Sequence, residues 1–448
     1  MLDDPGSHSR DAARAHAGGR SRIRKLTKTL LVCLVFALPA SGSILMMVDA
    51  IFNGQSDVQG LRGASAAAIS SDGTNVYVVG ALDDAVAVFE RDPETGTLDF
   101  LEYHQDGVDG VENLRSPSDI VVSPDGRHVY VTSELDDSLG VFRRVSFGRL
   151  GFVRSYVSYV DGIWGIGGAS AVTVSPDGTL VFVTGRFEDS LAVFSRSATS
   201  NDLVLSDVES SYYGSPGLTG ASDVSVSPDG RHVYATGEID DAIAIFAKDP
   251  TQDAIAFVDW LPNGVNGVTG LSGASSITLD KMGAFAFATG RWSDALAVFS
   301  RESSTGLLFP ETVYSNSQAG IEGLAGASDV TLDVSSELVC VTGSADDSIV
   351  LFQRAPDSPE LQFTELLQND SELVEGLDGA SSIAASPDGH HLYVTGAYDD
   401  SIVTVAILSN LFFDGFESGD AFRWEATVPM LEADGPPRES GEQPLVQQ

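Results

Sequence analysis

A unit of 52 or 53 residues repeats seven times along the chain, and this regularity constrains the fold more than any other feature. The fourth copy, GASDVSVSPDGRHVYATGEIDDAIAIF, spans residues 220–246. Every copy has a Ser near its start and an Asp 19 residues later. The serines are Ser65, Ser118, Ser170, Ser222, Ser275, Ser328 and Ser381, and the aspartates are Asp84, Asp137, Asp189, Asp241, Asp294, Asp347 and Asp400. A fixed period of this length indicates a fold built from similar supersecondary units.

Each copy alternates apolar and polar residues in short runs between turn residues, which is typical of antiparallel strands. In the fourth copy these runs are DVSVS, HVYATG, AIAIF and AIAFVDWL. An SPDG turn separates the first two runs, and an Asp-Asp turn, which we call the acidic turn, separates the second from the third. Four such strands match one blade of a propeller. The sequence therefore predicts an all-β fold, a seven-bladed β-propeller of four-stranded antiparallel blades.

The seventh copy lacks its fourth strand after residue 407. A substitute is available near the amino terminus, because VDAIFNG at 48–54 precedes Ser65 by the same interval that separates VDWLPNG at 258–264 from Ser275. We predict that residues 45–52 form the outermost strand of the last blade. This arrangement would close the ring and remove open sheet edges.

The two ends of the chain differ from the repeats. Residues 10–28 are basic and are followed by TLLVCLVFALPASGS at 29–43, which is typical of an export signal. We predict an export signal over 1–42, the propeller over 43–410 and a short, largely disordered tail over 411–448. A membrane anchor is the alternative, but it would need the apolar stretch at 44–52 that the repeat assigns to a strand. The mature chain is then expected in the periplasm or outside the cell, without a stable membrane span.

The formal net charge is −39, which repels nucleic acid and anionic lipid. Of the two cysteines, Cys33 lies in the leader and Cys340 stands where other copies have Tyr or Phe, so Cys340 is interpreted as a core thiol. We expect a monomer with no cofactor, no metal and no nucleic-acid partner.

The direction of the turns places the acidic turns and the Gly-rich linkers on one face of the ring, and the SPDG turns on the other. The seven turn aspartates could form a cation site. A structural turn ring is the favoured interpretation, because such an Asp accepts backbone N–H groups and could reach the Ser and Thr of its own blade. His128, His232 and His391 share a position beside the SPDG turn and are expected at the surface of the opposite face.

The copies diverge just before the final Asp of the acidic turn. The residue three before it reads Ala81, Glu134, Arg186, Glu238, Arg291, Ser344 and Ala397, and the next reads Leu82, Leu135, Phe187, Ile239, Trp292, Ala345 and Tyr398. An Arg pair can hold a carboxylate or phosphate, and a Glu can act as a general base on water. Glu238 is therefore the candidate catalytic residue, and the candidate substrate-binding residues are Arg186, Arg291, Glu134, Phe187, Trp292 and Tyr398. Ordinary loop variation is the alternative.

The segments SPDGRHVYVTSELDDSLGVFRR at 123–144 and SPDGHHLYVTGAYDDSIVTV at 386–405 resemble the YVTN-type repeats of the propeller-lactonase family. This family includes 6-phosphogluconolactonase-like and muconate-cycloisomerase-like proteins, and the resemblance covers roughly residues 44–408. The resemblance implies the propeller fold, and family enzymes are expected to build a site from Arg, Glu and His at the channel mouth.

Two functions remain open from the sequence. The favoured one is an exported scaffold that binds a protein, a glycan or a small-molecule ligand through the face with the acidic turns, because the blades are uniform. The alternative is a lactonase-like hydrolase acting on a sugar or organic-acid lactone, with the site on the arc of Arg186, Glu238 and Arg291.

Overall fold

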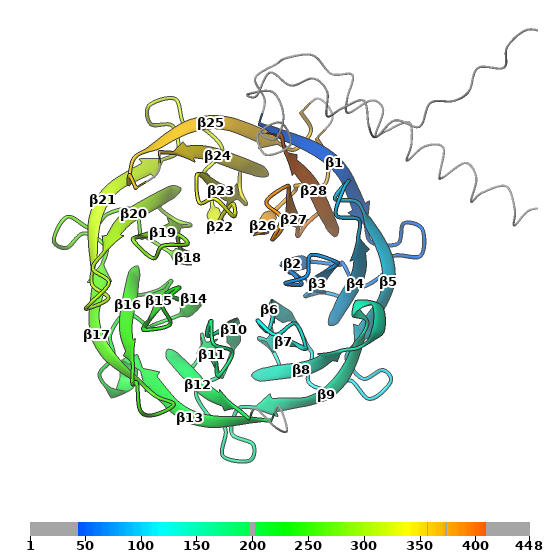
Figure 1. The fold of residues 1–448 in the computed structure, drawn as a ribbon, viewed down its shortest axis with the longest axis horizontal. Coiled ribbons are helices and arrows are strands. Elements are labelled where there is room, and N and C mark those ends of the chain that lie inside the picture. Colours follow the sequence, from blue (N-terminus) through cyan, green and yellow to red (C-terminus); the bar gives the residue numbers. More distant parts are fainter. Residues whose placement is uncertain (1–43, 198–201, 356, 372–373, 409–448) are drawn as a thin grey trace, which may run out of the picture. The chain divides into compact units, whose positions relative to one another are not determined.

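The computed structural model describes residues 44–197, 202–355, 357–371 and 374–408. The predicted export signal and tail lie outside these residues. The described chain forms seven four-stranded antiparallel sheets arranged in a ring (Figure 1). The predicted seven-bladed β-propeller is confirmed.

The strands of each blade follow one another from the channel to the outer rim, as their order in the sheets shows. From blade 1 to blade 7 they are β2 (Ala64–Ile69), β3 (Asn75–Gly80), β4 (Ala85–Arg91), β5 (Leu98–Gln105); β6 (Pro117–Val122), β7 (His128–Ser133), β8 (Ser138–Arg144), β9 (Leu150–Val157); β10 (Ala169–Val174), β11 (Leu180–Gly185), β12 (Ser190–Arg196), β13 (Leu203–Ser210); β14 (Ala221–Val226), β15 (His232–Gly237), β16 (Ala242–Lys248), β17 (Ile255–Pro262); β18 (Ala274–Leu279), β19 (Phe285–Gly290), β20 (Ala295–Arg301), β21 (Leu308–Ser315); β22 (Ala327–Leu332), β23 (Leu338–Gly343), β24 (Ser348–Arg354), β25 (Leu361–Gln368); β26 (Ala380–Ala385), β27 (His391–Gly396) and β28 (Ser401–Ile407). Two short 3-10 helices, η1 (Ser146–Gly148) and η2 (Ser211–Tyr213), lie in connecting segments.

The amino-terminal strand β1 (Leu45–Phe52) completes blade 7, as predicted. It pairs antiparallel with β28, from Leu45 opposite Ile407 to Phe52 opposite Ser401. The Glu365 carboxylate of blade 6 also accepts the backbone N–H groups of Ile44 and Leu45 at 2.7 and 3.0 Å. The ring is therefore closed by strand pairing within blade 7, between the amino-terminal strand and the last strand, and a side chain of blade 6 fixes the start of β1.

Apolar side chains fill the spaces between neighbouring blades. Phe182 of blade 3 and Phe246 of blade 4, for example, lie in one cluster and are fully buried. Burying one such side chain contributes about 1.5–3 kcal/mol. Because each blade covers its neighbour in this way, the ring has a continuous core and no blade is complete alone.

A ring of hydrogen bonds links the innermost strands. Ser222 Oγ donates to the carbonyl of Ala274 in the next blade at 2.7 Å and lies 2.8 Å from Thr236 Oγ1 in its own blade. Ser381 makes the same contact to Ala64 at 2.9 Å, so the circle closes. This repeated contact explains why the first Ser of each copy is constant.

On the SPDG face a cation from the third strand of one blade reaches into the preceding blade. The cations are Arg91, Arg144, Arg196, Lys248, Arg301 and Arg354. Arg301 donates to Tyr234 Oη at 2.7 Å and to Asp229 at 3.1 Å, and it lies 2.7 Å from His232 Nδ1. We call these contacts the polar junctions.

The prediction that His128, His232 and His391 lie at the surface is wrong. Their residues are only 3%, 4% and 2% exposed. Each has its Nδ1 within 3.0 Å of the junction Arg of the next blade. Burial, followed by the charge of Arg91, lowers the pKa of His391 to about 4.

The contact between blades 6 and 7 is apolar instead. Leu338 stands where three other blades have His, Cys340 stands where the others have Tyr or Phe, and Ile407 stands where the others have the cation. All three belong to one core cluster. Cys340 is free and fully buried, and burial raises the pKa of its thiol well above its usual range. Its predicted location in the core is observed.

Candidate functional site

The acidic turns tie each blade to the linker of the next. The final Asp of every turn adopts a left-handed backbone, with φ between 49° and 54°, a conformation that Asp tolerates better than most residues. Its carboxylate accepts a backbone N–H from the following linker, as in Asp241 to Gly273 at 2.7 Å. The same contact, at 2.6–2.9 Å, is made by Asp84, Asp137, Asp189, Asp294, Asp347 and Asp400. These aspartates therefore hold the linkers in place. The hydrogen bonds between the Ser and Thr of a blade, such as Ser222 and Thr236, are separate contacts.

The candidate residues Arg186 and Glu238 form an ion pair between blades 3 and 4. Glu238 is 5% exposed, so its carboxylate is buried against the guanidinium of Arg186. Arg291 is exposed on blade 5, and no hydrogen bond or ion pair joins its side chain to another described residue. Glu134 is half-buried on blade 2. Of the predicted arc of Arg186, Glu238 and Arg291, the structure pairs the first two with each other. Arg291 is the cation of this arc whose side chain is free to bind an anion.

Six large apolar side chains surround the channel on this face, and we call them the apolar collar. Their residues are 57–78% exposed: Leu82, Leu135, Phe187, Ile239, Trp292 and Tyr398. Phe187 and Trp292 lie directly over Gly168 and Gly273, where any side chain would collide with the rings. The predicted contact residues Phe187, Trp292 and Tyr398 therefore form part of a ring around the mouth.

Three carboxylates in the channel wall were not singled out from the sequence. Asp119, Asp223 and Asp329 follow the first Ser of copies two, four and six, where the other copies have Ala66, Ala171, Ser276 and Ser382. They lie on innermost strands of alternate blades. We call them the channel aspartates, and their alternation along the aligned copies is the signal that could have identified them.

The channel aspartates lie toward the acidic-turn end of the channel. Asp223 is paired with Thr236 on β15, two residues before Glu238 in the acidic turn. Asp119 has the same register opposite Thr132, two residues before Glu134. The wall of the channel and the divergent turn positions are therefore close neighbours in each blade.

Each channel aspartate accepts backbone N–H groups from two blades. Asp119 Oδ1 accepts from Ile120 and Oδ2 from Val172 of blade 3, both at 2.8 Å. Asp329 also accepts from Ser276 Oγ at 2.8 Å. These bonds hold the carboxylates in fixed positions in the channel wall.

Burial raises the pKa of all three channel aspartates above the ordinary value. Burial, together with the negative charges of the other two, raises the pKa of Asp119 to about 7. Burial and the charge of Asp329 raise the pKa of Asp223 to about 6, and burial raises the pKa of Asp329. The backbone hydrogen bonds oppose these shifts in each case. Carboxyl groups with such pKa values can both accept and donate a proton at neutral pH.

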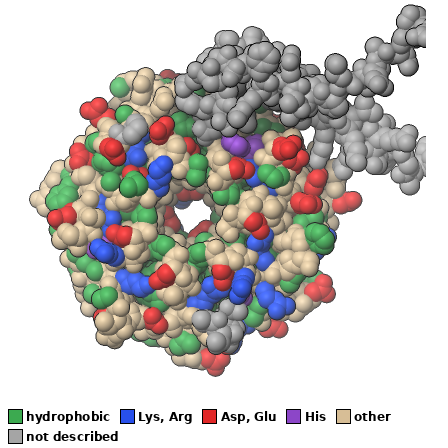
Figure 2. Space-filling view, in the orientation of Figure 1, with side chains coloured by type: hydrophobic (Ala, Val, Ile, Leu, Met, Phe, Trp, Pro, Cys, Tyr) green, Lys and Arg blue, Asp and Glu red, His purple; other side chains and the backbone are tan. Residues whose placement is uncertain are grey.

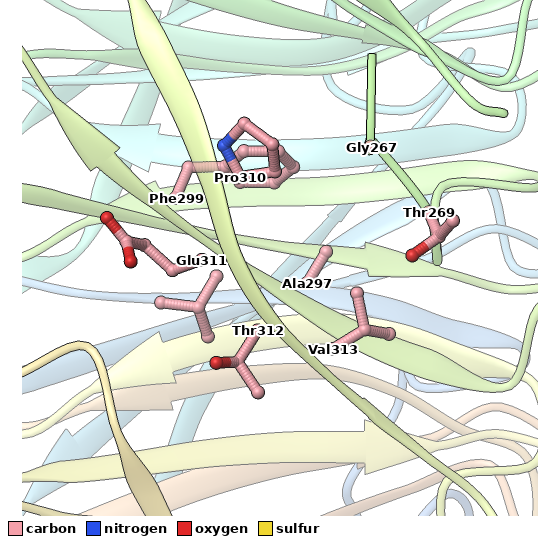
Figure 3. A pocket seen from close by; sticks show the side chains of 9 residues that line it. Gly267, Thr269, Ala297, Phe299, Pro310, Glu311, Thr312 and Val313 are labelled. Carbon is pink, nitrogen blue, oxygen red and sulfur yellow. The ribbon is translucent and has the colours of Figure 1, made fainter. Parts of the chain in front are cut away.

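Figure 2 shows the ring with an opening at its centre. Two grooves lie on the outside of the ring. One, of about 630 Å³, lies between blades 2 and 3 and is lined by residues including Arg154, Ser155 and Asp161. The other, of about 160 Å³ on blade 5, has Glu311 as its single charged residue, whose carboxylate points away from Thr269 (Figure 3). The smaller groove offers no cation for an anionic substrate.

Within the described ranges, no group of three or more His, Cys, Asp or Glu side chains has an arrangement that could hold a metal ion. No helix in the same ranges has the length and apolar character needed to cross a membrane.

A family model identifies the family of this chain. The family model described as "Lactonase, 7-bladed beta-propeller" matches residues 110–217, 205–308 and 226–369, which together exceed half of the chain. A 6-phosphogluconolactonase from Klebsiella pneumoniae (strain 342) is 24% identical over 221 residues, covering 48% of this chain and 63% of the relative. The aligned part therefore spans less than two thirds of that relative.

Solved structures show the same fold. The periplasmic gluconolactonase of Pseudomonas aeruginosa matches with a TM-score of 0.55 and 20% identity, over 71% of this chain and 90% of that one. Hydrazine synthase of Kuenenia stuttgartiensis matches with a TM-score of 0.58 and 15% identity, over 80% of this chain and 99% of that one. Identities this low show the fold alone, and the second match illustrates that one fold can carry different chemistry. The extent of the family-model match establishes that the chain belongs to the seven-bladed β-propeller lactonase family.

Proposed function

We propose that this protein is a lactone hydrolase whose site lies at the acidic-turn mouth of the channel. The observation that carries the proposal is the set of three channel aspartates, fixed in one wall and with raised pKa values. Membership of the lactonase family supports this function over the scaffold function favoured by the sequence.

The proposed chemistry needs one ionised and one protonated carboxyl group. The oxygen of water bonds to the lactone carbonyl carbon while the ionised carboxylate takes a proton from that water. The bond between the carbonyl carbon and the ring oxygen then breaks, and the protonated carboxyl gives its proton to the leaving oxygen. Asp119 and Asp223 suit these roles, because burial and mutual repulsion keep them partly protonated at neutral pH.

Side chains at the acidic-turn mouth of the channel would bind and orient the substrate. Arg291 is exposed and can hold a carboxylate, a phosphate or the developing oxyanion, whereas Arg186 already neutralises Glu238. The rings of Trp292 and Phe187 can contact the substrate ring. The hydroxy-acid product carries a new negative charge, so the acidic wall favours its release.

The test is hydrolysis of a panel of sugar and aliphatic lactones by the purified protein and by an Asp119→Asn/Asp223→Asn variant. General acid–base catalysis contributes about 10²- to 10⁴-fold, so the variant should lose kcat by that factor. Asp253→Asn, which changes an exposed carboxylate on a loop of the SPDG face, is the matched control and should keep full activity. Absence of turnover by the unchanged protein, or full turnover by the double variant, would contradict the proposal.

A second candidate function is the binding scaffold, and the apolar collar is the observation that favours it. Six exposed apolar side chains around one mouth exceed the scattered apolar residues of an ordinary surface. A partner bound there would cover the channel. Protection of the collar by a partner, in a protein that has no lactonase activity, would favour this function.

The place of action is also part of the proposal. The basic and apolar leader at 10–43 supports export, and a substrate outside the cytoplasm follows from it. The net charge of −39 supports a partner or substrate other than nucleic acid.

A further inference from the structure

Two neighbouring linkers depart from the pattern of the other five. The linker between blades 2 and 3 carries Tyr159 and Trp164, and the linker between blades 3 and 4 carries Tyr212 and Tyr213. At the position of Tyr159 three other linkers have glycine, and at the position of Trp164 the other linkers aligned without a gap have Gln, Glu or Thr. In a protein whose copies are so uniform, a concentrated departure indicates a local role beyond the fold.

Tyr159 occupies a strained position. Its φ of 61° lies in the left-handed region, which the corresponding Gly54, Gly107 and Gly264 adopt without a penalty. A bulky residue there is an outlier, and such strain is typically retained at functional sites. The fold accepts glycine at this position, so the tyrosine side chain is not needed to form the turn.

Glu188 of blade 3 organises this linker. Its carboxylate accepts from Ser158 Oγ at 2.8 Å and from the backbone N–H of Gly165. A hydrogen bond to the same carboxylate raises the pKa of the Tyr159 hydroxyl. The exposed tyrosine is therefore held in place by a second divergent residue, because most other acidic turns have Asp where blade 3 has Glu188.

The aromatic rings of the two linkers contact one another. Trp164 and Tyr213 have ring centroids 6.1 Å apart at 85°, and Tyr212 and Tyr213 have centroids 5.3 Å apart at 84°. Even so, Tyr159, Tyr212 and Tyr213 are 79%, 86% and 72% exposed, and Trp164 is 40% exposed. We call these four residues the aromatic cluster. The linker of Tyr159 also lines the larger groove, through Asp161 and its neighbours.

We propose that the aromatic cluster binds a neutral oligosaccharide. The C–H faces of a pyranose ring are weakly positive and stack on the negative faces of Tyr and Trp rings. Asp161 lies on the same linker as Tyr159 and Trp164, and Glu188 is hydrogen-bonded to that linker, so both supply acceptors for sugar hydroxyl groups. The same carboxylates and the net charge of −39 repel uronic-acid and other anionic polymers. This site is separate from the channel aspartates and does not depend on lactone hydrolysis.

The experiment follows Trp fluorescence and affinity electrophoresis of the full chain with cello-, malto- and chito-oligosaccharides, and with an alginate oligomer as the anionic comparison. Binding of at least one neutral oligosaccharide is expected. Trp164→Ala and Tyr213→Ala should each weaken it about tenfold, as loss of one stacking ring predicts. Tyr103→Ala removes an aromatic ring of blade 1 that is 39% exposed, close to the 40% of Trp164, and should leave the affinity unchanged.

Three results would overturn the proposal. One is the absence of binding to every neutral sugar, and another is preferential binding of the alginate oligomer. The third is concentration-dependent self-association, measured by sedimentation, that Trp164→Ala abolishes in a protein that binds no sugar. Lactone hydrolysis by Trp164→Ala should match that of the unchanged protein, so failure of this site is distinguishable from failure of the catalytic proposal.

Discussion

The two faces of the ring use charged residues in opposite ways. On the SPDG face, buried Arg, His and Tyr side chains and more exposed Asp side chains satisfy one another across the polar junctions, as around Arg301. On the acidic-turn face, the Arg291 side chain has no hydrogen-bond or ion-pair partner among the described residues, Asp119 and Asp223 have raised pKa values, and apolar rings are exposed. The difference indicates that buried polar contacts stabilise the SPDG face, whereas the acidic-turn face, besides its contacts to the linkers, has side chains available for the proposed chemistry.

The sharpest contrast is between two arginines of blade 5. The Arg301 side chain is 1% exposed, and its removal leaves Tyr234, His232 and Asp229 without their shared partner. Leaving a buried polar group without a partner costs about 1–3 kcal/mol, and Arg301→Ala removes a partner from the buried Tyr234 and His232, so it should lower the free energy of unfolding by about 3 kcal/mol. Arg291→Ala should change it by no more than about 0.5 kcal/mol. Urea unfolding measures both, and equal losses would remove the distinction between the faces.

The two faces should also differ in how their contributions to the free energy of unfolding depend on pH. The folded pKa of His391 is about 4 against an ordinary 6.5, so the unfolded chain binds the proton more tightly between these values. Stability therefore falls as pH drops from 6.5 to 4, by roughly 3 kcal/mol for this group. Asp119 has the opposite sign, because its folded pKa is raised from 3.8 to about 7 and its contribution is lost as pH rises through that range.

Unfolding midpoints between pH 4 and pH 8 test these slopes with His391→Gln and Asp119→Asn. His391→Gln should reduce the loss of unfolding free energy as the pH falls toward 4. Asp119→Asn should raise the free energy of unfolding above that of the unchanged protein, and most strongly at neutral pH. Identical pH profiles for the two variants would contradict the assignment of opposite roles to the two faces.

The smallest predicted effect concerns the hydrogen bonds from the start of β1 to Glu365 of blade 6. Glu365→Gln keeps one acceptor for the N–H groups of Ile44 and Leu45 but loses the charge. The expected cost is about 1 kcal/mol, because a charge-assisted bond becomes neutral. A drop in melting temperature, with the lactonase activity of the folded protein unchanged, is the expected result. A drop as large as that of Arg301→Ala would show that closure depends on this carboxylate.

The repeat made most of the fold predictable. Periodicity, turn residues and the offset of residues 45–52 sufficed for the blades, the faces and the closing strand, because each depends on local pattern. The burial of His232 was not predictable in this way, since its partner Arg301 comes from the next blade, 69 residues later. A polar residue beside a turn looks like a surface residue until its partner in another blade is known.

The candidate site was only partly predictable for a related reason. Arg186, Glu238 and Arg291 were found because they break the repeat, but their pairing depends on side-chain reach between blades. Asp119, Asp223 and Asp329 also break the repeat in an alternating manner. Their raised pKa values come from burial and from one another's charge across the channel, which no spacing in the sequence reveals.

The most direct test of the central claim is the pH dependence of kcat/KM for lactone hydrolysis by the unchanged protein and by Asp223→Asn. We predict an acid limb that reports a group of the free enzyme with a pKa between 6 and 7. Asp223 has the lower pKa of the two and is the ionised base, so Asp223→Asn should lower kcat/KM by about 10²- to 10⁴-fold. The limb of the remaining activity should change position, because it then reports Asp119 without the charge of Asp223. A limb that keeps its position in the variant, or a profile that is flat across this range, would contradict catalysis by the channel aspartates.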